Sequence, residues 1–160
     1  MKGNRPTIII LMADDDEDDY LLAREALAES RLVNHLYFVR DGEALMDYLH
    51  RRGEYSQIVN SPRPGLILLD LNMPKKDGRE ALREIKSDPH LRQIPVVVLT
   101  TSRAPEDIYQ IYDLGANSFI TKPVTFSSLV DLIKILGKYW FEVVELPGEL
   151  VGEKYEQRPR

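Results

Sequence analysis

The sequence contains no cysteine, and this absence excludes several kinds of chemistry. The chain has no means of forming a disulfide bond, a thiolate metal site or a cysteine nucleophile, and it fits a reducing compartment. Long apolar runs are also missing: none approaches the roughly 20 residues that a membrane helix needs. Ile8–Met12 is apolar but too short, with too little positive flank, for a signal peptide. We therefore expect a cytoplasmic protein with no membrane partner.

Clusters of positive charge are absent as well. The 160 residues carry 21 Lys and Arg against 26 Asp and Glu, which gives a formal net charge of -5. Only Arg51–Arg52 and Lys75–Lys76 place two basic residues side by side. Because phosphate-backbone binding is driven by clustered Lys and Arg, we expect no nucleic-acid partner. The three histidines are isolated, without metal-like spacing, so we interpret them as structural or solvated.

What the sequence does contain is a regular alternation of strand and helix patterns. Apolar runs of strand length are followed each time by apolar residues at helical spacing. The expected strands are 7–13, 36–39, 66–69, 96–99 and 118–121, and the expected helices are 21–28, 44–49, 78–86, 105–115 and 126–137. Five such alternations predict a single α/β domain with a parallel sheet and helices on both faces. Residues 53–65 show neither pattern and are expected to form a long loop.

Polar residues follow four of the expected strands at the point where each strand ends. These residues are Asp14 and Asp15, Asp70, Thr100, and Lys122. The carboxyl ends of parallel strands lie at one edge of the sheet, where open α/β sheets bind ligands, so we expect these side chains to meet. Three carboxylates this close repel one another unless a cation intervenes, and all-oxygen ligands are typical of Mg²⁺.

The acidic run over residues 14–19 has a second interpretation. Six consecutive acids are also typical of the first turn of a helix, where the helix dipole is positive. This explains the last four acids well, but Asp14 and Asp15 come first and share the sheet edge with Asp70. The run by itself leaves both interpretations open.

Beside a divalent cation, Asp70 has the chemistry of a nucleophile toward phosphorus, which would make an aspartyl phosphate. Thr100 and Lys122 would hold the remaining phosphoryl oxygens through a hydrogen bond and an ion pair. Thr101 and Ser102 also follow the fourth strand, and spacing favours Thr100 over them.

This set of residues resembles the receiver domain of two-component response regulators over residues 7–138. The matching features are Asp14–Asp15, Asp70 in the run D-L-N-M-P-K-K-D-G, Thr100, and Lys122–Pro123. The resemblance implies a flavodoxin-like, doubly wound five-stranded parallel sheet. It implies that Asp70 accepts a phosphoryl group from a sensor histidine kinase or a phosphotransfer protein, and that the chain is a signalling protein rather than an enzyme.

The resemblance also implies finer roles. Asp15, Asp70 and the backbone carbonyl of Asn72 would ligate Mg²⁺, with Asp14 acting largely through water. The Lys122–Pro123 peptide is usually cis in such domains. Thr100 would be drawn toward the phosphoryl group while Phe119, on the fifth strand, swings inward as a switch. Since Phe119 has no hydroxyl, the switch would not be hydrogen-bonded.

More narrowly, the 53–65 loop, the K-K-D-G run and the apolar tail resemble response regulators that partner bacterial phytochromes. Such proteins are single receivers and are often homodimers. Only about 22 residues follow the last helix, too few for a helix-turn-helix domain. We interpret residues 139–160 as an extension whose apolar cluster, Tyr139–Trp140–Phe141, Val143–Val144 and Leu146–Pro147, is a dimer contact. The alternative is a tail folded back on its own domain.

Three other functions share some of these features with the receiver domain. A phosphatase of the haloacid-dehalogenase type also uses an aspartate nucleophile, but it needs a second acid two residues later, where this chain has Asn72. A flavodoxin-like nucleotide or flavin binder needs a phosphate loop after the first strand, where this chain has repelling acids. A degenerate receiver that acts as an interaction module is disfavoured by the intact set of site residues.

Overall fold

The computed structural model describes residues 8–29, 35–58, 61–140 and 146–147. Strands and helices alternate along the chain. The elements are β1 (Ile9–Ala13), α1 (Glu17–Glu29), β2 (His35–Val39), α2 (Gly42–His50), the 3-10 helix η2 (Gly53–Ile58), β3 (Leu66–Leu69), α3 (Gly78–Ser87), β4 (Val96–Thr100), α4 (Pro105–Asp113), β5 (Ser118–Thr121) and α5 (Phe126–Lys138). The strands form one five-stranded parallel sheet in the order β2-β1-β3-β4-β5.

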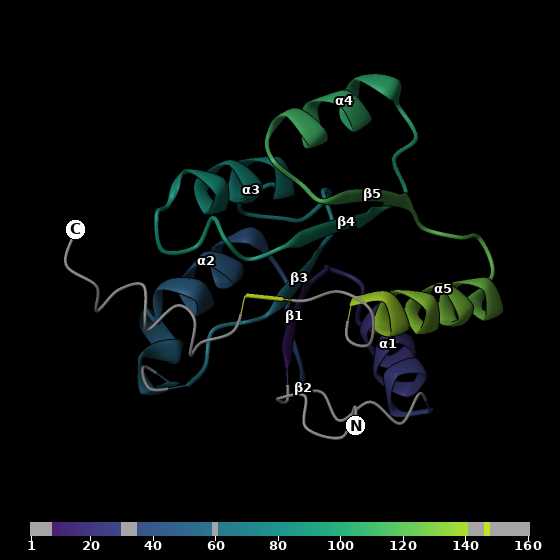
Figure 1. Ribbon diagram of the computed structural model, residues 1–160, viewed down its shortest axis with the longest axis horizontal. Coiled ribbons are helices and arrows are strands. Elements are labelled where there is room, and N and C mark those ends of the chain that lie inside the picture. Colours follow the sequence, from purple (N-terminus) through teal and green to yellow (C-terminus); the bar gives the residue numbers. More distant parts are fainter. Residues whose placement is uncertain (1–7, 30–34, 59–60, 141–145, 148–160) are drawn as a thin grey trace.

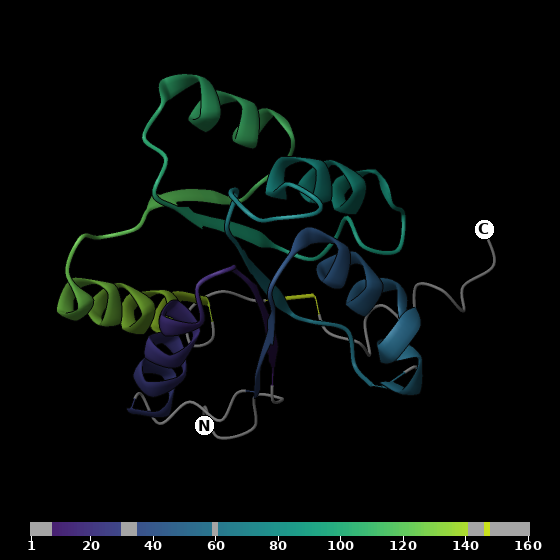
Figure 2. The same ribbon diagram turned by 180° about the vertical axis from the view of Figure 1, so that it is seen from behind.

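Helices cover both faces of this sheet, so the doubly wound receiver fold is confirmed. Helices α1 and α5 pack together on one face, and α2, α3 and α4 lie on the other (Figure 1), an arrangement that Figure 2 shows from behind. No helix in the described ranges is long and apolar enough to cross a bilayer.

Burial explains why the three central strands are almost entirely apolar, with Thr100 at the end of β4 as their one polar residue. Every residue of β1, β3 and β4 is buried, because helices cover both of their faces. The edge strands differ: β2 alternates between exposed and less exposed residues, and β5 is half-buried throughout. Uninterrupted apolar runs therefore mark the centre of the sheet.

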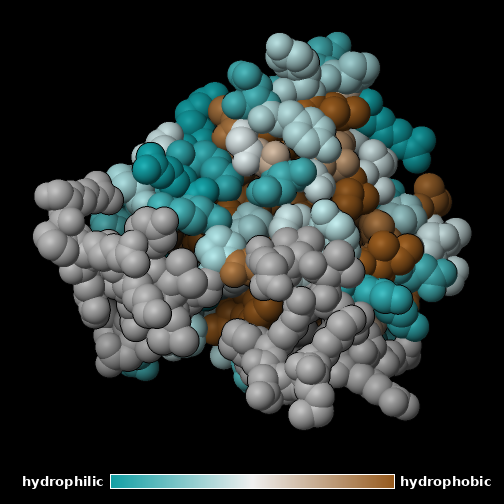
Figure 3. Space-filling view, viewed as in Figure 1, coloured by the Kyte–Doolittle hydropathy of each residue, from teal (hydrophilic) through white to brown (hydrophobic). Residues whose placement is uncertain are grey.

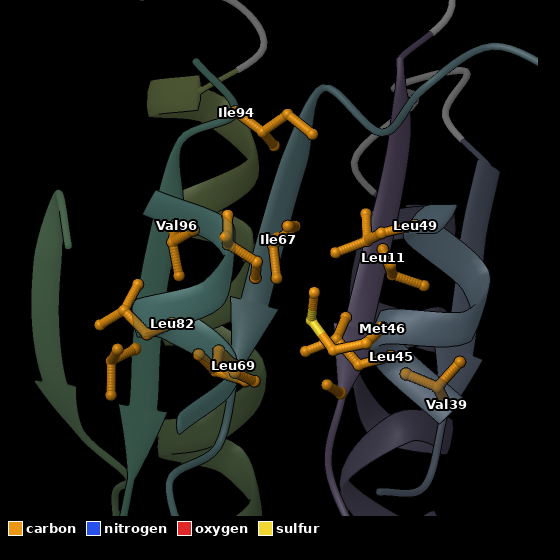
Figure 4. Close-up of a cluster of buried hydrophobic side chains, with 14 of the residues drawn as sticks. Leu11, Val39, Leu45, Met46, Leu49, Ile67, Leu69, Leu82, Ile94 and Val96 are labelled. Atoms are coloured by element: carbon orange, nitrogen blue, oxygen red, sulfur yellow. The ribbon is translucent and has the colours of Figure 1, made fainter. Parts of the chain in front are cut away.

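Side chains from alternate positions of these strands form a core with the helices of each face. On the α2 and α3 face, Leu11, Ile67 and Val96 point from the strands toward Leu45 of α2 and Leu82 of α3 (Figure 4). The opposite face is filled by a second cluster with α1 and α5. The two clusters hold the sheet rigidly between two helical layers.

Polar side chains fix where most helices begin. The carboxylate of Asp41 accepts the Ala44 N–H at the start of α2, Asp77 accepts the Arg79 N–H at the start of α3, and Thr125 caps α5. Helix α4 begins at Pro105 without a side-chain cap, and Ile111 is its one buried residue.

Most predicted element limits lie within two residues of the observed ones, and two expectations differ by more. Helix α1 starts at Glu17, four residues before the predicted start at 21, because Glu17, Asp18 and Asp19 form its first turn. The expected 53–65 loop contains the short helix η2.

The apolar cluster after α5 packs partly on the chain itself. Trp140 is 6% exposed and lies in the core cluster beneath α5, and Leu146 packs against the same cluster. Tyr139 is 52% exposed. Phe141, Val143 and Val144 lie outside the described residues. For Trp140 and Leu146, contact with the chain's own core is therefore the observed arrangement.

Gly78 lets α3 begin directly against the end of β3. A Cβ on Gly78 would lie 2.3 Å from the backbone oxygen of Asp70 and 2.7 Å from Leu71 Cα. The Gly78 N–H donates to the Leu71 carbonyl at 2.9 Å. The D-G pair after Met73–Pro74 therefore supplies a helix cap and a close backbone approach.

We expect Gly78→Ala to lower the free energy of unfolding by about 1–3 kcal/mol, because the added methyl group meets backbone that has no room to move. Urea unfolding followed by circular dichroism measures the change. Gly65→Ala is the matched control: its methyl group would meet the Cγ2 atom of Ile8, which belongs to a side chain rather than to backbone, and should cost less. Equal costs for the two variants would contradict this account.

Candidate functional site

Backbone hydrogen bonds between neighbouring strands position the residues that follow the strand ends. The backbone N–H of Asp14 donates to Val39 at 3.1 Å, that of Asp70 to Ala13 at 2.9 Å, and that of Lys122 to Thr100 at 2.7 Å. Each residue therefore continues the hydrogen bonding of its strand by one step. This brings the ends of β1, β3, β4 and β5 to a common edge, as the sequence predicts.

The ammonium group of Lys122 lies at the centre of the cluster. Its Nζ donates to Asp14 Oδ2 at 2.8 Å, to Asp19 Oδ2 at 2.8 Å and to Asp70 Oδ2 at 3.1 Å. An ammonium has three N–H donors, so each carboxylate takes one of them. The Lys122 side chain is only 9% exposed, which makes these charge-assisted bonds strong.

A polar pocket of about 300 Å³ opens beside this cluster. Its walls come from the loops after β1, β3, β4 and β5, together with the start of α1 and one residue of α5. The lining residues are Asp15, Asp16, Asp19, Asp70, Asn72, Thr101, Lys122, Pro123 and Leu129. Asp70 is 6% exposed and lines this pocket.

Burial and neighbouring charges shift the pKa values of Asp14 and Lys122. Burial raises the pKa of Asp14 to about 7, although the hydrogen bond and charge of Lys122 act in the opposite direction. For Lys122, burial alone would lower the pKa, but the hydrogen bonds to Asp14 and Asp19 hold it above its usual value. The amine therefore stays charged at neutral pH, whereas Lys122 only partly offsets the cost of burying the negative charge of Asp14.

The acids that surround the amine have the chemistry of a cation site. Asp14, Asp15 and Asp70 each offer a carboxylate oxygen, and these oxygens lie within 4.8 Å of one another. Together with Asp19 they are four carboxylates facing a single ammonium, so the cluster carries excess negative charge. All-oxygen donors with excess negative charge fit a hard divalent cation. Asn72 lines the same pocket, and its N–H points to Asp70 Oδ1 at 3.4 Å.

The two threonine hydroxyl groups at the end of β4, those of Thr100 and Thr101, occupy different positions. Thr100 is fully buried, and its Oγ1 has no hydrogen-bond partner among the residues that the structure describes. A buried hydroxyl without a partner costs about 1–3 kcal/mol, so it is ready to donate when an acceptor arrives. Thr101, over which spacing favoured Thr100, lines the pocket wall.

Phe119 on β5 is half-buried and packs against the core cluster on the α2 and α3 face. Its backbone N–H donates to the hydroxyl of Tyr112 on α4 at 3.1 Å. The aromatic ring is therefore neither fully exposed nor fully inside.

Two features of the site differ from the sequence-based account. The Lys122–Pro123 peptide is trans, whereas the family resemblance implied cis; the amine reaches all three carboxylates in this form. Asp19 is a site residue that the sequence attributed only to the start of a helix. The signal that could have found it is its place in the first turn of the helix that directly follows Asp14 and Asp15, at the same edge of the sheet.

In metal-free protein, we expect the stability contribution of Asp14 to fall as the pH rises from about 4 to about 7. The folded chain keeps a proton on Asp14 with its pKa of about 7, whereas the unfolded chain releases it near 3.8. Asp14→Asn removes this charge and should raise the free energy of unfolding at pH 7.5 by about 1 kcal/mol or more. Urea unfolding with a chelator at pH 4.5 and 7.5 measures both effects.

The matched control for this prediction is Asp18→Asn. Asp18 is exposed in the same stretch and is not among the partners of Lys122. If Asp14→Asn gives the same gain at both pH values, or no more than the control, the assigned cause is wrong.

Comparison with known proteins agrees with this geometry. Residues 10–134 match the family model of the response regulator receiver domain. The chain is 45% identical over 145 residues to response regulator Rcp1 of Synechocystis sp., covering 91% of this chain and 97% of that protein.

Two solved structures are similar over 89% of this chain and 100% of theirs. The phosphorylated cyanobacterial phytochrome response regulator RcpA is 47% identical with a TM-score of 0.84. The Mn²⁺-bound form of Rcp1 is 45% identical with a TM-score of 0.83. With the family model covering most of the chain and a relative that matches over nearly its full length, this protein belongs to the response regulator receiver family.

Proposed function

We propose that this receiver accepts a phosphoryl group on Asp70 from a sensor histidine kinase or a phosphotransfer protein. The observation that carries the proposal is the position of Asp70, a buried carboxylate that borders an open polar pocket with the Lys122 ammonium 3.1 Å away. A carboxylate held against a fixed cation is oriented for attack and is protected from bulk water.

In the proposed step, a carboxylate oxygen of Asp70 attacks the phosphorus of a phosphohistidine. The P–N bond breaks, the imidazole nitrogen keeps the electron pair, and an acyl phosphate forms on Asp70. Lys122 turns an N–H toward a phosphoryl oxygen, and Thr100 Oγ1 donates its unpaired hydrogen bond to another. Mg²⁺ held by Asp14, Asp15, Asp70 and the carbonyl of Asn72 would neutralise charge on the phosphoryl oxygens.

The output is a shift of population on the face formed by α4, β5 and α5. Movement of Thr100 toward the phosphoryl group vacates space beside β5, and Phe119 takes it up by turning inward. The half-buried position of Phe119 and its link to Tyr112 of α4 support this role.

The phosphodonor is proposed to be a phytochrome kinase in the cytoplasm. Support comes from the phytochrome response regulators among the similar structures. Apolar side chains also lie on the surface beside the site: Figure 3 shows hydrophobic residues around α5 and the loop before it. In that loop, next to Lys122–Pro123, Val124 is 90% exposed, and Phe126 at the start of α5 is 71% exposed. Such residues suit a protein donor.

A turnover enzyme of the haloacid-dehalogenase type is not supported by the pocket. That reaction needs a general acid two residues after the nucleophile. Asn72 occupies this position on the pocket wall, and its amide has no acidic proton to give.

Incubation with acetyl phosphate and Mg²⁺ is expected to add one phosphoryl group, which intact-mass spectrometry detects. Asp70→Asn should abolish the adduct, because an amide oxygen is a poor nucleophile. Chelation of the metal should also abolish it. Asp113→Asn, an exposed aspartate of α4, is the matched control and should label like the native chain. An adduct that persists in Asp70→Asn would contradict the proposed acceptor.

We further propose that the chain forms a homodimer through the α4 side of the output face. Tyr109 and Tyr112 of α4 are 78% and 49% exposed, and large aromatic residues are enriched in interfaces. Sedimentation with and without a beryllofluoride phosphoryl mimic should show a dimer that strengthens with the mimic. Monomers under both conditions would exclude it.

A further inference from the structure

Asp19 stands apart from the other acids around Lys122. Its Oδ2 accepts from Lys122 Nζ at 2.8 Å, as close as Asp14 and closer than Asp70 at 3.1 Å. Its side chain is 14% exposed, so the ion pair is largely shielded from water. Yet Asp19 is not one of the three acids whose oxygens gather within 4.8 Å. It contacts the amine without belonging to the cation cluster.

The other two carboxylates bonded to Lys122 lie where they can contact two cations, the ammonium and a divalent metal ion. Asp14 and Asp70 are bonded to the amine and also belong to the acid cluster that fits a divalent cation. An ammonium and a dication close together repel each other, and both would draw on the same carboxylates. Cation binding therefore requires Lys122 to weaken its bonds to Asp14 and Asp70.

We propose that Asp19 is a positioning residue that retains the Lys122 ammonium at the pocket wall when a divalent cation engages Asp14 and Asp70. The proposal rests on the receiver function proposed above. Asp19 draws the amine toward the first turn of α1 and away from the cation cluster. The same ion pair keeps Lys122 oriented, so two of its N–H donors become available to a phosphoryl group on Asp70.

Helix α1 suits this task. Glu17, Asp18 and Asp19 form its first turn, and only three residues separate the turn from the end of β1. The Asp14 Oδ1 atom accepts the Asp16 N–H at 2.9 Å, which fixes the short connection between strand and helix. The short connection from β1 to α1 therefore fixes the positions of both Asp14 and Asp19.

The test is a double-mutant cycle on cation affinity, measured by calorimetric titration with Mn²⁺ and with Mg²⁺. Asp19→Asn keeps a hydrogen-bond acceptor but removes the charge. In the native background we expect it to weaken cation binding about tenfold, since the amine is then drawn more firmly onto Asp14 and Asp70. In the Lys122→Met background the same substitution should weaken binding by no more than about twofold, since there is no amine to position.

Asp18→Asn makes the same charge change one residue away, on an exposed side chain, and should have little effect in either background. Thermal unfolding of every variant without metal verifies that each is folded. Asp19→Glu restores the charge and should recover part of the affinity.

Equal costs of Asp19→Asn in the two backgrounds would overturn the proposal, because Asp19 would then act on the cation directly. So would a native chain that binds no divalent cation, or equal effects of the Asp18 and Asp19 variants. Labelling by acetyl phosphate distinguishes a failure of this proposal from a failure of the proposed phosphoacceptor function. A native chain that binds Mn²⁺ but takes no phosphoryl group refutes phosphoacceptance, and the cycle still decides the role of Asp19.

Discussion

The ammonium group of Lys122, shared by Asp14, Asp19 and Asp70, is the interaction on which this edge of the molecule depends. Buried charges are stable only when they are paired, and removing one partner leaves an uncompensated charge. The partners come from the end of β1, the first turn of α1 and the end of β3, while Lys122 follows β5. A single amine thus ties four elements together at the carboxyl edge of the sheet.

Pairing is nonetheless incomplete, and this is what makes the edge a site. Acids outnumber the amine, the pKa of Asp14 is raised to about 7, and the hydroxyl of Thr100 is buried without a partner among the described residues. Each of these features costs stability in the resting chain. Under the proposed function, all would be relieved by the same two events, namely binding of a cation and arrival of a group with phosphoryl oxygens.

Most of this arrangement could be predicted from the sequence because it follows from chain order. Buried parallel strands read as unbroken apolar runs, and residues after their carboxyl ends meet at one edge, so Asp14, Asp70 and Lys122 follow from the pattern alone. Asp19 does not, because an acid in a first turn has a sufficient local explanation. The packing of Trp140 could not be predicted from the pattern either. Whether an aromatic residue near a terminus packs on its own core or on another chain depends on three-dimensional shape, which periodicity does not encode.

The close approach at Gly78 makes the attachment of α3 stiffer than that of α4. Helix α3 begins against the Asp70 backbone with no room even for a methyl group, so any displacement there meets a steep repulsion. Helix α4 is anchored by Ile111 and by an ion pair between Arg79 and Asp107 at 2.8 Å, and a partly exposed pair of this kind is worth about 1 kcal/mol. Under the proposed function, a displacement at Asp70 would therefore be taken up on the α4 side rather than on the α3 side.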